Sequence, residues 1–496
     1  MKKILNGVIS SKYVFMLIFN SQFSIIQTFS MKKILYISLI ISLLAGLSAC
    51  KNFLEIPPQD PASILVEDAF KTKNDFQKLL TSCYDAARSN TYYGGRLVYA
   101  SDFMADDIDG SLFTGDWASV YGHRTSTFIP ITSEIWQDPY LVVYRCNSLE
   151  ELMNTLTIPD LTAADKERML GEARFLRALT HFEIVRLYGQ PVGGGKDNDI
   201  QSGIPIRLVP DQSKIVRSTT QEVYAQVLSD LDAAIAKLPE TNGIYADKWA
   251  AKGMKAKVLF QMNRNDEALA LLEEIINSSG KTLNTDLTKR YAVAGDAGNT
   301  EVVFGLLSAK ASLSEMIDSY AKRPSAGISL TEALLNETKV EPNDIRDSLW
   351  LEVKNAGTPI QRIQSNKFKY FSGRECVLPI LHLTELTLMR AEINALKGSG
   401  DAALGDLNKI RTRANLLPYT STVQNALVTE IRHQRRIEMF GEGNRLHDLK
   451  RIGAFYQPDL LIRTSPWDCP GMILQIPNSE AAGNLDIMFN EQGGCE

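Results

Sequence analysis

The sequence predicts a mainly α-helical protein in which helix hairpins form a scaffold and long irregular loops carry the ligand face. Two observations predict the scaffold: apolar residues recur with helical spacing, and one helix-pair pattern occurs twice. A third observation, four long stretches without sustained periodicity, predicts the loops. Of the 496 residues, 44% are hydrophobic and 22% charged, which is typical of a globular protein with a substantial core.

The first apolar segment of interest has the form of an export signal. Met31-Lys32-Lys33 is a positively charged start, residues 34–49 form an uncharged run of sixteen, and Leu47-Ser48-Ala49 is a small-residue cleavage site before Cys50. The run is shorter than the roughly 20 residues of a membrane-spanning helix. We therefore expect residues 31–49 to be a signal peptide.

The cleavage site indicates a lipid anchor. The form L-S-A-C resembles the bacterial lipobox, in which the cysteine becomes the acylated N-terminus, so we expect lipidation of Cys50. An ordinary signal peptide with an incidental cysteine is the alternative. Residues 1–30 also begin with Met-Lys-Lys, and we interpret them as an over-extended start. Residues 50–496 show no linker that cuts them, and we expect one domain.

The segment "GEARFLRALTHFEIVRLYGQP" predicts an amphipathic helix. Its apolar residues lie three or four positions apart and form one stripe: Phe175, Leu179, Phe182 and Val185. Gly189 and Pro191 are expected to end this helix.

Two later segments each predict a helix hairpin of the tetratricopeptide type. Residues 250–277 contain two helices around the polar turn 263–265, and residues 383–415 repeat the arrangement around 398–400. The second helices share the pattern D-x-A-L-x-x-L-x-x-I, beginning at Asp266 and Asp401, which are 135 residues apart. This shift is close to four tetratricopeptide periods of about 34 residues. We expect each Asp to be a helix N-cap.

The loops are predicted at residues 89–135, 189–218, 279–380 and 453–496, which are rich in Gly, Asn, Asp, Ser, Pro and aromatic residues. Loops of this length in a compact protein are usually functional, so we expect the ligand site on them.

Cysteine use gives neither a zinc site nor a clear disulfide framework, because no C-x-x-C spacing occurs. Apart from Cys50 there are five cysteines, and we expect them to be buried free thiols; a bridge between Cys469 and Cys495 is the alternative. The remaining cysteines are Cys83, Cys146 and Cys376. The net charge of -5, without a basic cluster, argues against a nucleic-acid partner.

Several segments in the same order resemble one family. These are "KNFLEIPP", "WQDPYLVVYRCN", "GEARFLRALTHFEIVRLYGQPV", the hairpin from "PILHLTELTLMRAEINAL" onward, "IRHQRRIEMFGEGNRLHDLKRIG" and "LQIPNSE". Together they make the chain similar, over nearly all of residues 50–496, to the SusD/RagB-like outer-membrane nutrient-binding lipoproteins of Bacteroidetes. The chain departs from the family at His382, where Arg is usual, and in a degraded Q-N-P-G-Y motif at the end.

The resemblance implies a non-catalytic protein without a cofactor. It implies that the protein binds a nutrient at the cell surface and delivers it to a SusC-like TonB-dependent outer-membrane transporter, and that a lipid anchor holds it in the outer membrane. The nutrient is expected to be a glycan, with a peptide as the alternative.

Two further functions are weighed against this one. A surface glycoside hydrolase needs two carboxylates in a cleft, and Glu438, Glu442 and Asp448 lie near His447 in one block. We expect instead that this block, with Arg445, forms ion pairs across helices and with Arg411 or Arg413. A purely structural helical-repeat adaptor is the other alternative; the aromatic residues of the loops count against it.

A glycan site needs flat aromatic side chains beside fixed polar groups. The loop "ASDFMADDIDGSLFTGDWASVYGHR" best fits this need, and its candidate ligand-binding residues are Trp117, Tyr121, Asp102, Asp107 and Arg124. A second candidate group is Tyr320, Trp350 and Tyr370. The alternative is that Trp117 and Tyr121 form one helical stripe packed into the core. Asp107, Asp109 and Gly110 resemble part of a calcium loop, but Ala105 stands at its first ligand position and we expect no metal.

Overall fold

The structure, a computed structural model, describes residues 66–496 except for 112, 212, 293–298, 309–314, 322–326, 369–375 and 496. The predicted start region, the signal peptide, Cys50 and Tyr370 therefore lie outside the described residues. The chain divides into two compact units, residues 1–71 and 72–496. The described part of the first unit contains the short helix α2 (Val66–Ala69), and all other elements belong to the second unit.

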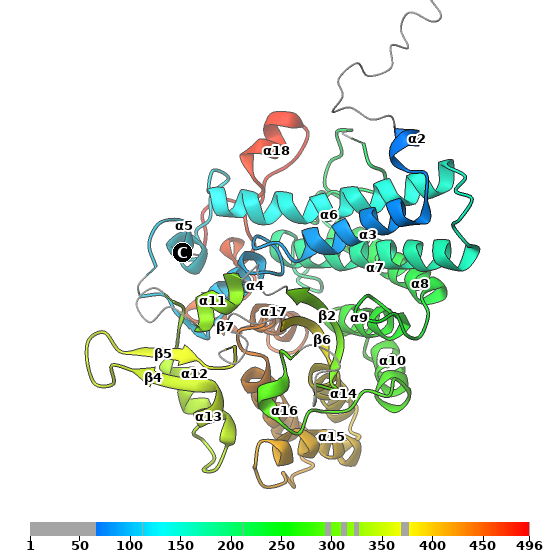
Figure 1. The fold of residues 1–496 in the computed structure, drawn as a ribbon. Helices are drawn as coiled ribbons and strands as arrows, with labels where there is room; N and C mark the ends of the chain where they lie inside the picture. The colour runs from blue at the N-terminus through cyan, green and yellow to red at the C-terminus, as the bar shows by residue number, and fades with distance from the viewer. Residues whose placement is uncertain are drawn as a thin grey trace, which may run out of the picture. The chain divides into compact units, whose positions relative to one another are not determined.

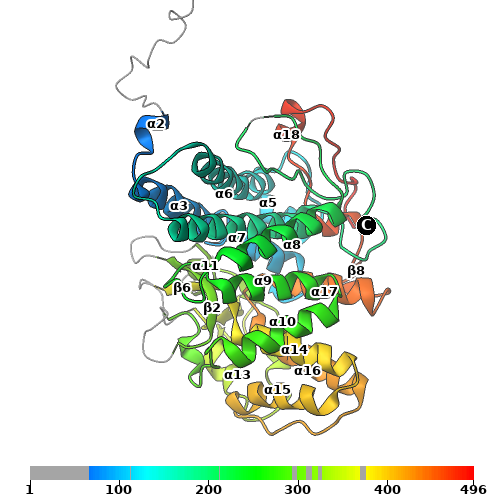
Figure 2. The ribbon, with the colours of Figure 1, turned by 90° about the vertical axis from the view of Figure 1, so that its right-hand side faces the viewer.

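The second unit is mainly helical, as predicted (Figures 1 and 2). Neighbours along the chain pack side by side, from α6 to α10 in order, and α10 then packs against α14, which contacts both α15 and α16. The long helices are α3 (Lys73–Ala87), α6 (Pro130–Thr155), α7 (Ala163–Tyr188), α8 (Thr220–Lys237), α9 (Lys248–Gln261), α10 (Asn265–Ser278), α14 (Leu383–Leu396), α15 (Gly400–Arg413), α16 (Gln424–Met439) and α17 (Arg445–Phe455).

Shorter elements occupy the stretches predicted to be irregular. The short helices are α4 (Arg96–Met104), α5 (Gly115–Tyr121), η1 (Leu287–Lys289), α11 (Glu315–Ala321), α12 (Glu332–Glu337), α13 (Ile345–Trp350), η3 (Pro470–Met472) and α18 (Asn478–Gly483). Four two-stranded antiparallel sheets pair β1 (Ile108–Asp109) with β3 (Ser329–Leu330), β2 (Val302–Ser308) with β6 (Cys376–His382), β4 (Leu351–Lys354) with β5 (Arg362–Ser365), and β7 (Leu461–Ile462) with β8 (Ser465–Pro466).

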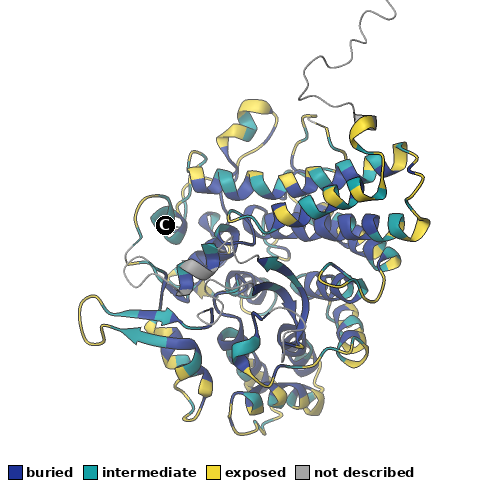
Figure 3. Cartoon of the chain, viewed as in Figure 1, coloured by how far each residue is buried: buried dark blue, intermediate teal, exposed yellow. Residues whose placement is uncertain are grey.

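Helix α7 lies at the centre of the helical layer. Thr162 caps its N-terminus by accepting a hydrogen bond from the Asp165 amide, and the helix ends at Tyr188 before Gly189, as predicted. The predicted apolar stripe is buried, but so is every residue from 169 to 188 except Arg174 (Figure 3). The helix is therefore not amphipathic over this range, because α6 and α8 cover its two sides.

The two predicted helix hairpins are confirmed as α9–α10 and α14–α15. The predicted N-caps are wrong: Arg264 and Ser399 hold the cap positions, and Asp266 and Asp401 lie one residue inside the first turn. A carboxylate there still interacts favourably with the helix dipole. The second hairpin packs on α16 through an apolar cluster: Leu388, Ala391, Ala395, Ala403, Leu407, Ile410, Leu427, Val428 and Ile431.

A network of buried charges joins the helices to the long segment 279–380. Glu438, near the end of α16, is fully buried, and its carboxylate pairs with Arg413 at 2.8 Å, Arg290 at 2.5 Å and Arg346 at 2.9 Å. Burial alone would raise the pKa of Glu438, but these three arginines lower the pKa to about 2. The side chain is thus held as a carboxylate.

Glu442 is a second centre of the same network. Its carboxylate lies 2.6 Å from the Lys367 amine, 2.9 Å from His382 Nε2 and 3.2 Å from the Arg290 guanidinium. Burial opposes ionisation, yet the neighbouring Lys367 holds the pKa of Glu442 well below its usual range.

The predicted ion pairs of the charged block across helices are confirmed. Glu438 pairs with Arg413, while Arg445 pairs with Asp106 and Asp448 with Arg435, each at 2.7 Å. Arg411 does not join the block and pairs instead with two glutamates outside it, Glu341 and Glu430.

The network predicts a large loss of stability when its central charge is removed. Glu438→Gln leaves three buried arginines without their shared carboxylate, and breaking a buried pair in this way costs about 3–5 kcal/mol. The measurement is the free energy of unfolding by chemical denaturation. Because Glu438 has a lowered pKa, its contribution is complete above pH 4.5 and is lost as the pH falls towards about 2. The difference between wild type and variant should therefore shrink over that interval.

The matched control is Glu273→Gln on the exposed side of α10, which should change the free energy of unfolding by less than about 0.5 kcal/mol. Equal stability of the Glu438→Gln variant and wild type at neutral pH would contradict a supporting role for the network.

Candidate ligand-binding site

An open groove of about 360 Å³ lies between α5 and the β4–β5 hairpin, and we call it the Tyr121 groove. Three parts of the chain line it: Tyr121, which we call one wall; β3 and Thr331, which we call the floor; and the end of the hairpin, which we call the other wall. The lining residues are Asp109, Ser111, Tyr121, Ser329, Leu330, Thr331, Glu332, Pro359, Gln361, Arg362 and Ile363.

Backbone pairing fixes the floor of the groove. Ile108 and Asp109 of β1 pair with Leu330 and Ser329 of β3, which brings the segment after α4 against the start of α12. The Ile363 amide donates to the Ser329 hydroxyl at 3.2 Å and so ties β5 to the same strand. Three segments that are distant in the sequence therefore meet here.

The hairpin wall follows from local sequence. The strands β4 and β5 pair in register from Leu351 with Ser365 to Lys354 with Arg362. The turn between them has left-handed residues at Asn355 and Gly357, with φ of 52° and 75°, which asparagine and glycine tolerate best. This turn places Gln361 and Arg362 at the groove.

Several polar groups in the groove have capacity for further hydrogen bonds. Within the described ranges, no ion pair involves Asp109, Glu332 or Arg362. Arg362 donates to the Gln361 carbonyl at 3.0 Å, and Gln361 donates to Glu332 at 3.0 Å. Two carboxylates and one guanidinium can thus accept and donate hydrogen bonds at one open surface.

Trp117 and Tyr121 are both partly exposed, so they are neither fully open to a ligand nor fully packed into the core. The Trp117 ring packs against Tyr99 and Phe103, with centroids 5.0 and 4.9 Å away. Tyr121 meets Phe113 edge-on at 5.7 Å and carries the Arg463 guanidinium at 3.9 Å from its ring centroid. Tyr121 lines the groove. Trp117, one helical turn earlier on α5, is not among the lining residues.

The predicted polar partners of these aromatics are not in the groove. Asp102 is buried and accepts hydrogen bonds from the Tyr320 hydroxyl at 2.6 Å and the Gly443 amide at 3.1 Å; burial raises its pKa to about 7. Asp107 is also buried and pairs with Arg436 at 2.7 Å. Arg124 is exposed on the segment after α5.

The second candidate group is corrected in part. Tyr320 is buried against Phe368 and bonded to Asp102, and Trp350 is 1% exposed beneath Arg290. Neither ring offers a face to a ligand, because Tyr320 is stacked on Phe368 and Trp350 lies beneath Arg290 and Lys367. Tyr370 is outside the described residues, and its role stays a prediction.

The expectation that all five cysteines other than Cys50 are free thiols is wrong. Cys469 and Cys495 form a disulfide, with their Cα atoms 5.4 Å apart, while Cys83 and Cys146 are free thiols and, like Cys376, are buried as expected. For the calcium alternative, the described residues contain no group of three or more His, Cys, Asp or Glu side chains placed to hold a metal ion.

Other cavities fit a ligand less well. A cavity lined by α4, α7, β6 and the segment before α17 has about 30 Å³, which accommodates about two water molecules. An open depression of about 680 Å³ beside α15 is lined by Leu283, Asn284, Thr285, Gly405, Asn408, Lys409, Thr412 and Arg413. That lining has no aromatic side chain, so the Tyr121 groove is the better candidate.

Of the residues that line the groove, the sequence predicts Tyr121 and Asp109 only as parts of the loop after α4, and it does not single out Glu332, Gln361 or Arg362. The available signal was a hairpin pattern, because "LEVK" and "RIQS" flank a turn that contains Gly and Pro. No feature of the local sequence predicts that this hairpin lies opposite α5.

Comparison with known proteins gives the family. Residues 53–260 match a SusD-like family model described as "Starch-binding associating with outer membrane", and residues 351–490 match the model of the SusD family. SusD-like protein P25 of Formosa agariphila is 25% identical over 292 residues, which cover 56% of this chain and 51% of that protein. SusD-like protein P2 of the same organism is 22% identical, with 91% of this chain and 98% of that protein covered.

Solved structures share the fold. A SusD superfamily protein from Bacteroides thetaiotaomicron superposes with a TM-score of 0.75 at 23% identity, covering 85% of this chain and all of the other. A laminarin-binding SusD-like protein and the surface glycan-binding protein A from Bacteroides uniformis have TM-scores of 0.67 and 0.68, at 19% and 18% identity. They cover 85% and 84% of this chain and 99% of each neighbour.

The chain belongs to the SusD/RagB-like family, whose members are described as binding proteins associated with the outer membrane. The match spans about half of the first curated relative and nearly all of the other one. None of the helices described between residues 66 and 496 combines the length and apolar character that crossing a bilayer requires.

Proposed function

We propose that this protein captures a glycan in the Tyr121 groove at the cell surface and delivers it to a SusC-like TonB-dependent transporter. The observation that supports the proposal best is the composition of the groove. It combines one aromatic wall with Asp109, Glu332 and Arg362, whose charges no described ion pair neutralises.

This composition suits a sugar because sugars present apolar C–H surfaces edged by hydroxyl groups. An aromatic ring can pack on the C–H surface, while carboxylates accept and guanidinium groups donate hydrogen bonds to hydroxyls. The names of two structural neighbours, a laminarin-binding protein and a surface glycan-binding protein, support a glycan over a peptide. Peptide binding by the same groove is the alternative.

The groove predicts which substitutions weaken glycan binding. Tyr121→Ala removes the aromatic wall and should weaken binding by about 1–3 kcal/mol, the scale of one stacking contact. Arg362→Ala removes a donor that makes no described ion pair, and it should weaken binding while leaving the melting temperature unchanged. The measurement is calorimetric titration with laminarin and starch oligosaccharides and with a casein digest.

Tyr144→Ala, on the exposed side of α6, is the matched aromatic control and should bind like wild type. Unchanged affinity of both groove variants for a glycan that binds the wild type would exclude this groove as the site. The same samples test hydrolysis: because the groove carries two carboxylates, release of shorter sugars over time would favour a glycosidase instead.

We also infer that the protein is held in the outer membrane by acyl chains on Cys50. Acyl chains are retained by the hydrophobic effect, so a high-salt wash should leave the protein in the membrane fraction. Cys50→Ala should give a soluble or unprocessed form, as judged by fractionation and fatty-acid labelling. A variant that remains in the membrane while the wild type takes up no label would contradict the anchor.

Delivery to a transporter requires a stable complex. Gentle detergent extraction should co-purify a barrel of roughly twice this protein's mass, on the scale of a plugged 22-stranded transporter. The interface should be large, because stable protein complexes bury at least about 1,200 Å². Recovery of the lipoprotein alone, even after chemical crosslinking in cells, would contradict this partner.

A further inference from the structure

The disulfide closes a C-terminal loop that is firmly attached to the helical scaffold. Cys469 and Cys495 are separated by 26 residues, and we call residues 469–495 the C-terminal loop. The Leu474 amide donates to the Leu187 carbonyl at 2.8 Å, and the Asn490 side-chain amide donates to the Tyr188 carbonyl at 2.8 Å. The loop therefore rests on the end of α7, where the helix is buried on all sides.

The C-terminal loop holds the segment that follows α5. A Cβ atom added to Gly471 would lie 1.9 Å from the His123 carbonyl oxygen, and one added to Gly494 would lie 2.8 Å from the same atom. The two glycines are within two residues of the two cysteines. In addition, the Asn478 amide donates to the Thr127 carbonyl at 2.8 Å.

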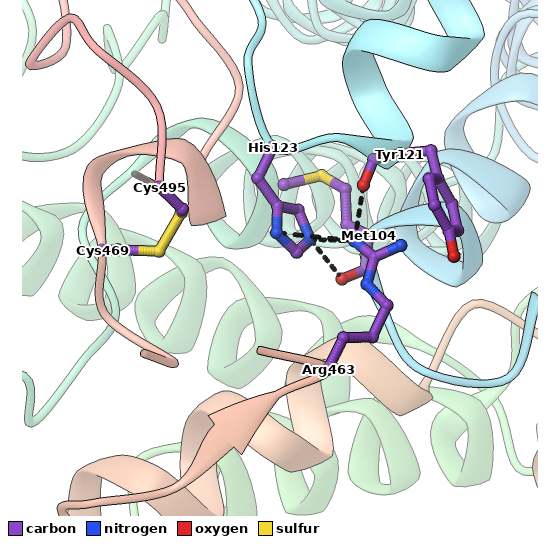
Figure 4. Close-up of a disulfide and its surroundings, with 6 residues drawn as sticks. All are labelled: Met104, Tyr121, His123, Arg463, Cys469 and Cys495. Atoms are coloured by element: carbon purple, nitrogen blue, oxygen red, sulfur yellow. Dashed lines mark hydrogen bonds between the residues drawn. A yellow bond between two sulfur atoms is a disulfide. The ribbon is translucent and has the colours of Figure 1, made fainter. Parts of the chain in front are cut away.

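Arg463 extends this contact to Tyr121 (Figure 4). It lies in the turn of the β7–β8 hairpin, which leads directly into Cys469. Its Nη2 donates to the Tyr121 carbonyl and lies 2.6 Å from His123 Nε2, which also lies 2.8 Å from the Met104 carbonyl, while the guanidinium lies over the Tyr121 ring. No carboxylate in the described part of the chain pairs with Arg463.

The backbone at this contact is unusual. Seven described non-glycine residues have a positive φ, and four of them are asparagines, which tolerate this conformation. His123, a residue type that is also enriched at positive φ, and Arg463, which is not, have φ of 53° and 58° and contact each other. Such conformations are unfavourable and persist where surrounding contacts fix them, often at ligand sites. Burial, followed by the charge of Arg463, lowers the pKa of His123 to about 4, so its ring is neutral.

We propose that Arg463 is a positioning residue for the ligand groove: held by the disulfide-closed C-terminal loop, it fixes the Tyr121 wall. The part of this proposal that concerns ligand affinity rests on the proposed glycan function; the part that concerns the order of residues 118–124 does not.

Hydrogen–deuterium exchange of the whole chain tests the structural part without a ligand. The amides of Gly122, His123 and Arg124 donate to carbonyls within α5 and report on its order. In Arg463→Ala, and in the double variant Cys469→Ser with Cys495→Ser, these amides should exchange about tenfold faster. Residues 383–413, which are remote from the disulfide, are the internal reference and should not change.

Thr464→Ala is the matched control, because it alters the exposed neighbour in the same turn. It should leave exchange at residues 118–124 unchanged. Wild-type exchange of this segment in both Arg463→Ala and the double cysteine variant would overturn the proposal, whatever the result of the glycan titrations.

A double-mutant cycle tests the link to the ligand, using the laminarin or starch oligosaccharide that binds the wild type. Arg463→Ala should weaken binding when Tyr121 is present and should have no further effect in the Tyr121→Ala background. Additive losses would overturn the positioning role, because they would mean that Arg463 acts on the ligand independently. If Tyr121→Ala leaves affinity unchanged, the groove assignment fails, while the exchange result still decides whether Arg463 orders this segment.

Discussion

The ion pairs of Glu438 are the constraint on which much of the remaining structure depends. The carboxylate brings together the end of α15, the segment before β2 and the start of α13, through Arg413, Arg290 and Arg346. The central charges balance, because four cations (Arg290, Arg346, Lys367 and Arg413) meet four carboxylates (Glu301, Asp344, Glu438 and Glu442). Balanced, hydrogen-bonded charges can be buried, whereas an unpaired one would cost several kcal/mol.

This network also positions one wall of the groove. The β4–β5 hairpin starts directly after α13, which carries Arg346, and ends just before Lys367. Both ends of the hairpin are therefore tied to Glu438 or Glu442, while its tip extends to the solvent. The same contacts explain why the glutamates of this block are unsuited to acid–base catalysis: their lowered pKa values keep them charged, and cations already occupy their oxygens.

The features that could be predicted from sequence are the local ones. Helix hairpins follow from spacing and turns within some 30 residues, so α9–α10 and α14–α15 were predictable. The burial of α7 on all sides was not predictable from the sequence, because its charged residues suggest a solvent-exposed face until their partners are known. Arg177, for example, pairs with Asp230 of α8. Trp350 and Tyr320 were misplaced for the same reason: they lie in a polar stretch, and distant segments cover them. The disulfide and the hairpin wall likewise depend on contacts between residues far apart in the sequence.

The two walls of the groove are fixed by independent parts of the chain, and this bears on how a sugar can be bound. Each hydrogen bond to a hydroxyl contributes little net free energy, because the same group was bonded to water before binding. Ordering a flexible side chain on binding costs about 0.5–1.5 kcal/mol, which is enough to cancel one such bond. A groove between two mobile loops would therefore bind sugars poorly. Here the buried charges hold the β4–β5 wall, and the α7-anchored C-terminal loop holds the segment with Tyr121. Much of the free-energy cost of ordering these side chains is therefore part of folding and does not oppose sugar binding.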